Sequence, residues 1–291
     1  MEMKMRIKFL DRKSTAEKIL YGVMFIIFSL FALSYLYIFF WGVVASLKTH
    51  TENVMKPFSF PVVPQWKNFI EVFTLFTPND TTFLEMTFNS IFFSVVPAAG
   101  GILFTSMLAY VTTKYRFFGA KAYYYLSFVV MLLPIYSSGS AMFKLIHNLG
   151  LMNNYLFVIT AFGGIGASYM YFAAFFKNLS WSYAEAAFID GANDWQVFFK
   201  VMLPQSMTML GALFLLSWMG AWNSYDAQLL YLPELPTLSV GIYLFDFDMK
   251  YYVRRDLLFA ACMVSSIPTL IVFICFNNIM MSNVSLGGIK E

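Results

Sequence analysis

Residues 182–204 read SYAEAAFIDGANDWQVFFKVMLP, and this stretch predicts a short helix, a turn and a second helix. Ser182 followed three residues later by Glu185 has the spacing of a capping box, which places the start of the first helix at Ser182. The alanines around Glu185 are strong helix formers. Gly191 interrupts this helix, because glycine is the residue that most readily ends a helix with a positive φ.

The second helix carries an apolar stripe. Large apolar side chains recur at i, i+3, i+4 and i+7 and lie on one helical face, which is made of Trp195, Phe198, Phe199 and Met202. Pro204 then marks the entry to the next element. The two helices together predict an amphipathic elbow. Periodicity alone leaves two interpretations open: an anchor that holds the loop in a membrane interface, and an element with a function of its own.

The sequence around the elbow is strongly apolar. The chain has 291 residues, of which 59% are hydrophobic and 12% charged, whereas a soluble globular domain carries about 25% charged residues. A helix needs about 20 apolar residues to cross the hydrocarbon core of a membrane. Stretches of this length occur at residues 19–46, 88–113, 122–146, 152–176, 206–230 and 257–281. The sequence therefore predicts an all-α membrane protein with six transmembrane helices.

Lysine and arginine residues predict the orientation of these helices. They crowd the N-terminal segment and recur at Lys114, Arg116 and Lys121, and such residues stay on the cytoplasmic side. Six spans then place both termini in the cytoplasm. The predicted organisation is a cytoplasmic N-terminal segment (1–18), a first transmembrane helix (19–46), an external loop (47–87), a five-helix core (88–281) with an inside loop (177–205), and a cytoplasmic tail (282–291).

Several functions are disfavoured by the same sequence. The basic residues are spread between apolar runs, so no basic face could follow a nucleic-acid backbone. A membrane-embedded enzyme needs a nucleophile, a base or a metal site that faces a cavity, and we predict no catalytic and no metal-binding residue. A secondary carrier typically shows inverted repeats and charges within its spans, and neither is evident. No Walker A pattern is present, so ATP hydrolysis is not expected in this chain.

The elbow resembles the EAA loop of the permease subunits of binding-protein-dependent ABC importers. The residues that carry this resemblance are Glu185, Ala186, Ala187, Asp190, Gly191, Ala192, Phe198, Val201, Leu203 and Pro204. The chain departs from the pattern at Thr208, where the family often has a second proline. The resemblance implies that this loop docks into a cleft of an ATPase subunit and couples it to transport. It also implies that Glu185 faces a basic group in that cleft.

Further motifs are similar to the carbohydrate-uptake branch of this family. They are Asn89-Ser90, Ala109-Tyr110, Lys114 to Phe117, Gly150-Leu151, Trp222-Asn223, Pro236 to Leu238 and Gly287 to Lys290. The resemblance implies a type I ABC importer permease fold in a prokaryotic inner membrane. It implies as partners a second permease, two copies of an ATPase that bind ATP and Mg, a solute-binding protein and membrane lipid. No cofactor is expected in this chain. The alternatives are an importer of a non-sugar solute and a secondary carrier.

One polar cluster lies within reach of the fifth predicted span. It consists of Trp222, Asn223, Tyr225 and Asp226. Aromatic rings with amide and carboxylate groups suit sugar recognition, and an ionisable group in a helix bundle is a functional candidate. The same residues also suit the outer membrane interface, where Trp and Tyr form belts. Both interpretations, a substrate pathway and a belt, remain open at this point.

Overall fold

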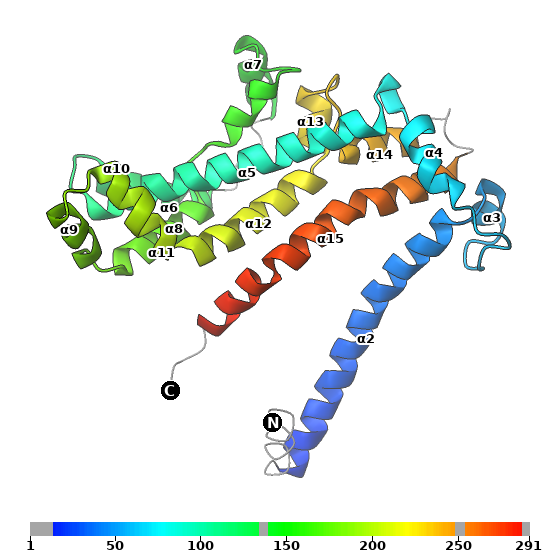
Figure 1. The fold of residues 1–291 in the computed structure, drawn as a ribbon, viewed down its shortest axis with the longest axis horizontal. Helices are drawn as coiled ribbons and strands as arrows, with labels where there is room; N and C mark the ends of the chain where they lie inside the picture. Colours follow the sequence, from blue (N-terminus) through cyan, green and yellow to red (C-terminus); the bar gives the residue numbers. More distant parts are fainter. Residues whose placement is uncertain (1–13, 134–138, 248–253, 287–291) are drawn as a thin grey trace. The chain divides into compact units, whose positions relative to one another are not determined.

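The computed structural model describes residues 14–133, 139–247 and 254–286, with side chains up to residue 276. Every regular element in this part is a helix (Figure 1), which confirms the predicted all-α class. In chain order the helices are α2 (Thr15–Ser46), α3 (His50–Met55), α4 (Lys67–Leu75), η1 (Pro78–Asp80), α5 (Phe83–Lys114), α6 (Ala120–Leu132), α7 (Gly139–Asn148), η2 (Tyr155–Ala161), α8 (Ala167–Asn178), α9 (Ser182–Ile189), α10 (Asp194–Gln196), η3 (Val197–Met202), α11 (Leu203–Gln205), α12 (Met207–Asn223), α13 (Asp226–Tyr231), α14 (Leu238–Phe247) and α15 (Arg255–Leu286).

Three described helices are long and apolar enough to cross a membrane, namely α2, α5 and the Arg255–Phe276 part of α15. A fourth candidate is the pair Asp194–Gln205 and Met207–Asn223, which is bent by 78°. The third and fourth predicted spans are occupied by shorter helices, α6 with α7 and η2 with α8. Residues 134–138, inside the third predicted span, lie outside the described part. The number of six spans therefore stays a prediction.

Two boundaries differ from the prediction because capping residues extend the helices beyond their apolar runs. Helix α2 begins at Thr15, where Ser14 and Glu17 form a capping box. Helix α5 begins at Phe83, five residues inside the predicted external loop. There Thr82 Oγ1 accepts from the Glu85 amide at 3.3 Å, and Glu85 Oε2 accepts from the Thr82 amide at 2.8 Å. At the other end of the chain, residues 287–291 of the predicted tail lie outside the described part.

The described chain forms two compact units. A first unit holds the residues up to Glu71 and those from Arg254 to Met263, and a second unit holds the remainder. In the first unit, the apolar side chains of α2 are exposed. No residue of its most apolar 18-residue window is buried within the chain. Such a helix needs lipid or another subunit to cover it.

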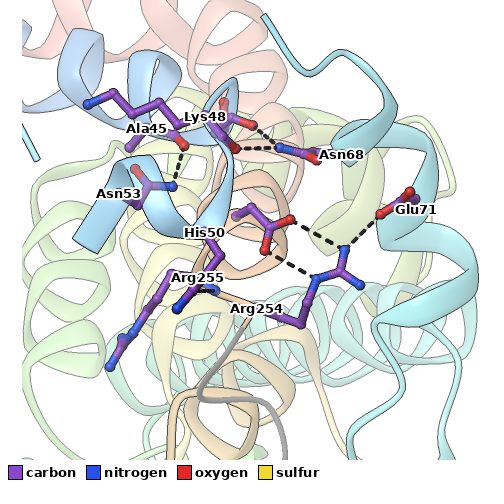
Figure 2. A network of polar contacts seen from close by, with 10 residues as sticks. Ala45, Lys48, His50, Asn53, Asn68, Glu71, Arg254 and Arg255 are labelled. Carbon is purple, nitrogen blue, oxygen red and sulfur yellow. Dashed lines mark hydrogen bonds and ion pairs between the residues drawn. The ribbon is translucent and has the colours of Figure 1, made fainter. Parts of the chain in front are cut away.

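The segment after α2 is held by polar contacts, and Figure 2 shows those of Asn68. Lys48 is fully buried, and its ammonium donates to the carbonyls of Lys56 and Pro57 at 3.0 and 2.8 Å. The Asn68 amide donates to the carbonyls of Ser46 and Lys48 at 2.8 and 3.0 Å. The Asn68 bonds satisfy carbonyls at and just beyond the end of α2, which have no partner within the helix. They fix the course of the predicted external loop.

A second group of contacts ties α4 to the start of α15. The Arg254 guanidinium bonds to the Glu71 carboxylate at 2.7 Å and to the Asp256 carboxylate at 3.2 Å. His50 Nδ1 accepts from the Arg255 amide at 3.3 Å, as Figure 2 shows. These residues belong to segments far apart in the sequence, so they close the first unit.

The second unit is built around α5, which packs against α8 and α12. The approach of α5 to η2 is close at Gly101, where a Cβ atom would lie 2.9 Å from the Ala161 carbonyl oxygen. The small residues around Gly101 therefore serve packing, because larger side chains would push η2 away. The Thr105 hydroxyl adds a bond to the Gly163 carbonyl at 3.2 Å.

The two ends of α5 meet different partners (Figure 1). At its first turns, Asn89 donates to the Pro236 carbonyl at 3.1 Å, and the Ser90 hydroxyl accepts from the Leu238 amide at 2.7 Å. Helices α9, α10 and α11 lie at its far end. The inside loops predicted at 114–121 and 177–205 thus lie together, away from the segment around Pro236, which connects the fifth and sixth predicted spans.

Candidate functional site

Helix α9 begins at Ser182, and the capping box predicted there is wrong. Trp181 already has helical φ and ψ, and no side chain caps the helix. Ser182 is instead the first residue of α9, and its amide donates to the Ser180 hydroxyl at 3.3 Å. The Trp181 ring packs against Tyr115 with 5.8 Å between ring centroids and against Phe188 with 6.2 Å. This packing draws Trp181 into the helix and displaces the predicted cap.

The turn after α9 has the geometry that the sequence predicts. Gly191 has φ of +82°, which confirms the predicted positive φ. The Gly191 amide donates to Phe188 at 3.0 Å, and the Ala192 amide donates to Ala187 at 2.9 Å. These two bonds form a Schellman motif, which satisfies the last carbonyls of a helix. The angle between the two halves of the elbow is therefore fixed by backbone bonds.

The second half of the elbow starts with a true capping box. The Asn193 amide donates to Gln196 Oε1 at 3.0 Å, and the Gln196 amide donates to Asn193 Oδ1 at 2.9 Å. The chain then winds as a π-helix in η3, where the Leu203 amide donates to the Phe198 carbonyl. This wider turn precedes Pro204, which has no amide hydrogen for the ordinary helical bond.

The single apolar face predicted for this half is wrong, because its side chains divide between the core and the surface. Phe198 and Met202 are buried in a core that includes residues of α5 and α8. Trp195 is 63% exposed and Phe199 is 43% exposed, and their rings stack with centroids 6.1 Å apart. Val197, which the pattern left out, is buried in their place.

The predicted coupling residues separate into two layers. The exposed outer layer contains Glu185, Ala186, Asp190, Gly191 and Pro204, and Ala187 and Ala192 are half-buried. Phe198 and Leu203 form the buried inner layer. The inner layer seats the elbow, with the Phe198 ring centroid 5.2 Å from that of Tyr110 on α5. The outer layer is an exposed surface of small residues that carries two carboxylates, those of Glu185 and Asp190.

Three polar residues that the sequence analysis did not assign to the coupling site fasten the elbow to α5. The Tyr115 hydroxyl donates to Asp194 Oδ1 at 2.6 Å. The Lys114 ammonium donates to the Leu179 carbonyl at 2.5 Å. Burial raises the pKa of Tyr115 well above its ordinary value, and the bond to Asp194 raises it further. The hydroxyl is therefore protonated at neutral pH and acts as the donor.

The predicted substrate-pathway residues do not share one surface. Trp222 is buried, and its carbonyl accepts from the Ser239 hydroxyl at 2.6 Å. Asn223, Tyr225 and Asp226 are exposed between α12 and α13. The Tyr225 ring stacks on Tyr243 of α14 with centroids 4.9 Å apart. Their role in a substrate pathway stays a prediction.

The chain belongs to the family of inner-membrane components of binding-protein-dependent transport systems. The model of this family matches residues 101–285, which is more than half of the chain. The matched region contains the whole elbow and most of the helices around it. The chain is therefore the membrane component of such a transport system. It is not the enzyme of that system. Membership implies partner subunits of the same system.

Characterised relatives are similar over most of their length. A permease protein of a diacetylchitobiose uptake system from Streptomyces coelicolor is 27% identical over 254 residues, which are 86% of this chain and 82% of that protein. A permease protein of an arabinooligosaccharide transport system from Bacillus subtilis is 24% identical, over 90% of this chain and 93% of that protein. A maltose/maltodextrin permease protein from Salmonella typhimurium is 28% identical, over 74% and 75%.

A solved structure has the same fold. It is the structure of a bacterial ABC transporter involved in the import of the acidic polysaccharide alginate. The match has a TM-score of 0.77 and covers 91% of this chain and 98% of that chain, at 21% sequence identity. The chain therefore has the fold of an ABC importer permease.

Proposed function

We propose that this chain forms half of the translocation pathway of a carbohydrate ABC importer, and that residues 182–204 couple it to an ATPase. The observation that carries the coupling role is the two-layered elbow. Its inner layer is fixed on α5 by Phe198, while Glu185 and Asp190 stand exposed on the outer layer. An exposed surface that is held rigidly by its packing on α5 can receive force from a partner protein and pass it to this membrane helix.

Carbohydrate is the favoured substrate class. The relatives from Streptomyces coelicolor, Bacillus subtilis and Salmonella typhimurium are named for diacetylchitobiose, arabinooligosaccharides and maltose or maltodextrin. All three are glycosides of more than one unit, so we favour an oligosaccharide. Import of a non-sugar solute is the alternative, and secondary transport is a weaker one.

The proposal includes a set of partners. The bare apolar surface of α2 favours a second permease subunit and lipid as its cover. Two copies of an ATPase would dock, one on each permease, and would bind the ATP and Mg. A solute-binding protein would deliver the sugar from outside. The basic N-terminal segment favours an inner-membrane protein with both termini in the cytoplasm.

Reconstitution in proteoliposomes tests the proposal. The chain is assembled with its partner permease, ATPase and binding protein, and uptake of labelled oligosaccharides is measured with and without ATP. We expect uptake that requires ATP and every subunit, and none by this chain alone. Sugar uptake by this chain alone would establish a secondary carrier. Uptake of amino acids in preference to sugars would contradict the substrate class.

A further inference from the structure

The exposed helix α9 is flanked by two residues, and each of them is hydrogen-bonded to the end of α5. Before α9, the Leu179 carbonyl accepts from Lys114 at 2.5 Å. After α9, the Asp194 carboxylate accepts from the Tyr115 hydroxyl at 2.6 Å. Lys114 is the last residue of α5, and Tyr115 follows it directly. One end of one helix thus holds both sides of the elbow.

We propose that Tyr115 is a positioning residue for coupling, and that its hydrogen bond to Asp194 transmits movement of the elbow to α5. The inference rests on the coupling function proposed above. It adds a specific route from the surface that meets the ATPase to a helix that crosses the membrane. The contact joins residues that are 79 positions apart in the sequence.

Apolar packing does not replace this bond. A groove of about 340 Å³ lies beside it, between Met107 and Val111 on α5 and Trp195 on the elbow. Close-packed interiors transmit displacement because neighbouring atoms have no room to move. On the side of this groove the elbow does not pack closely on α5, although Phe198 seats its inner side in the core. The Tyr115–Asp194 bond is the direct tie to α5 on this side.

The bond is suited to carrying force. A separation of 2.6 Å is typical of a charge-assisted bond from a hydroxyl to a carboxylate, which is stronger than a neutral one. The Tyr115 ring is held by edge contact with Trp181, at 5.8 Å between centroids. The Tyr110 hydroxyl lies 3.4 Å from the Tyr115 hydroxyl on the other side. The donor is therefore oriented before the elbow moves.

A purely structural role makes a different prediction. If the bond only stabilises the fold of the loop, its loss lowers stability and changes ATP hydrolysis and sugar uptake in proportion. If it transmits movement, its loss leaves ATP hydrolysis running while uptake falls. The ratio of ATP hydrolysed to sugar imported separates the two roles.

The experiment uses the complete complex in proteoliposomes. Tyr115→Phe removes the hydroxyl and keeps the ring against Trp181. Tyr125→Phe is the matched control, because it removes the same hydroxyl from an exposed tyrosine of α6. We expect Tyr115→Phe to raise the ATP hydrolysed per sugar by about 2- to 30-fold, with normal co-purification of the ATPase. Tyr125→Phe should leave the ratio unchanged.

A double-mutant cycle makes the test specific to the pair. Asp194→Asn keeps the shape of the side chain and the neighbouring Asn193–Gln196 cap. If both residues act through one bond, the double variant should be no worse than the worse single variant. The inference would be overturned if the effects of Tyr115→Phe and Asp194→Asn were additive. It would also be overturned if Tyr115→Phe left the ratio of ATP to sugar unchanged or lost the ATPase on purification. ATP-independent uptake by the wild-type complex would instead refute the proposed function.

Discussion

The Ala192 amide donates to the Ala187 carbonyl at 2.9 Å, across the left-handed residue Gly191. This bond joins the two halves of the elbow, because Ala187 lies in α9 and Ala192 precedes the next helix. It forms only when the residue between them has a positive φ. The relative direction of the two halves thus depends on one glycine.

Substitution of Gly191 should uncouple the transporter by altering this angle. A Cβ atom there meets no other atom within 4 Å, so the strain comes from φ alone. A valine at a positive φ costs about 1–3 kcal/mol. We expect Gly191→Val to retain the ATPase and hydrolyse ATP with reduced sugar uptake, measured in proteoliposomes.

Gly191→Asn is the matched control, since asparagine tolerates a positive φ better than other residues do. It should retain most of the uptake although its side chain is as large as that of valine. Equal losses in the two variants would show that the added volume matters and that the backbone angle does not.

Stability of the second unit should depend on the Ser90 hydroxyl. It accepts from the buried Leu238 amide at 2.7 Å, and Ser90→Ala leaves that amide without this partner. Such a loss costs about 1–3 kcal/mol. Ser94 is the control, because its equally buried hydroxyl bonds to Ile91 in its own helix at 3.3 Å. We expect Ser94→Ala to cost about 0.5 kcal/mol, at the low end for a single hydrogen bond.

Thermal unfolding of the purified complex measures this difference. The midpoint should fall clearly in Ser90→Ala and only slightly in Ser94→Ala. Equal shifts in the two variants would mean that the bond between α5 and α14 contributes no more than a bond within one helix.

The buried ammonium of Lys48 should hold the segment that follows α2. Its bonds to the Lys56 and Pro57 carbonyls are of the charged kind, which contribute about 1.5–3 kcal/mol. Lys48→Met should therefore increase hydrogen exchange in residues 56–66. Lys56→Met removes an exposed side chain and leaves its carbonyl in place, so exchange should stay near the wild-type level. Unchanged exchange in Lys48→Met would show that the segment is held by other contacts.

Local features of the elbow could be predicted from the sequence, and its contacts with the rest of the chain could not. The break at Gly191 follows from the conformational freedom of one residue, and the shared helical face of Phe198 and Met202 follows from helical spacing. The start of α9 depends on Trp181, whose ring packs on Tyr115 from a distant segment. The spacing of residues along the sequence does not predict a contact between such distant segments.

The apolar face predicted for the second half of the elbow is divided between the core and the surface, and spacing alone could not predict this. The pattern assumes 3.6 residues per turn, whereas η3 winds as a π-helix before Pro204 and buries Val197, which the pattern left out. Among the spans, the continuous apolar runs of α2, α5 and α15 were recognisable from hydropathy. The third and fourth predicted spans are composed of shorter helices, whose breaks a hydropathy window averages out.

The central claim is that the elbow is the surface on which the ATPase docks, and charge reversal at two glutamates tests it most directly. Glu185 is exposed on α9, and Glu234 is exposed at the opposite end of α5, between α13 and α14. Binding of the purified ATPase to the permease pair is measured in nanodiscs. Glu185→Lys should weaken binding by about 10- to 100-fold, the loss of a charge-assisted bond, while Glu234→Lys leaves it unchanged. Wild-type binding by Glu185→Lys, or equal weakening by Glu234→Lys, would contradict the account.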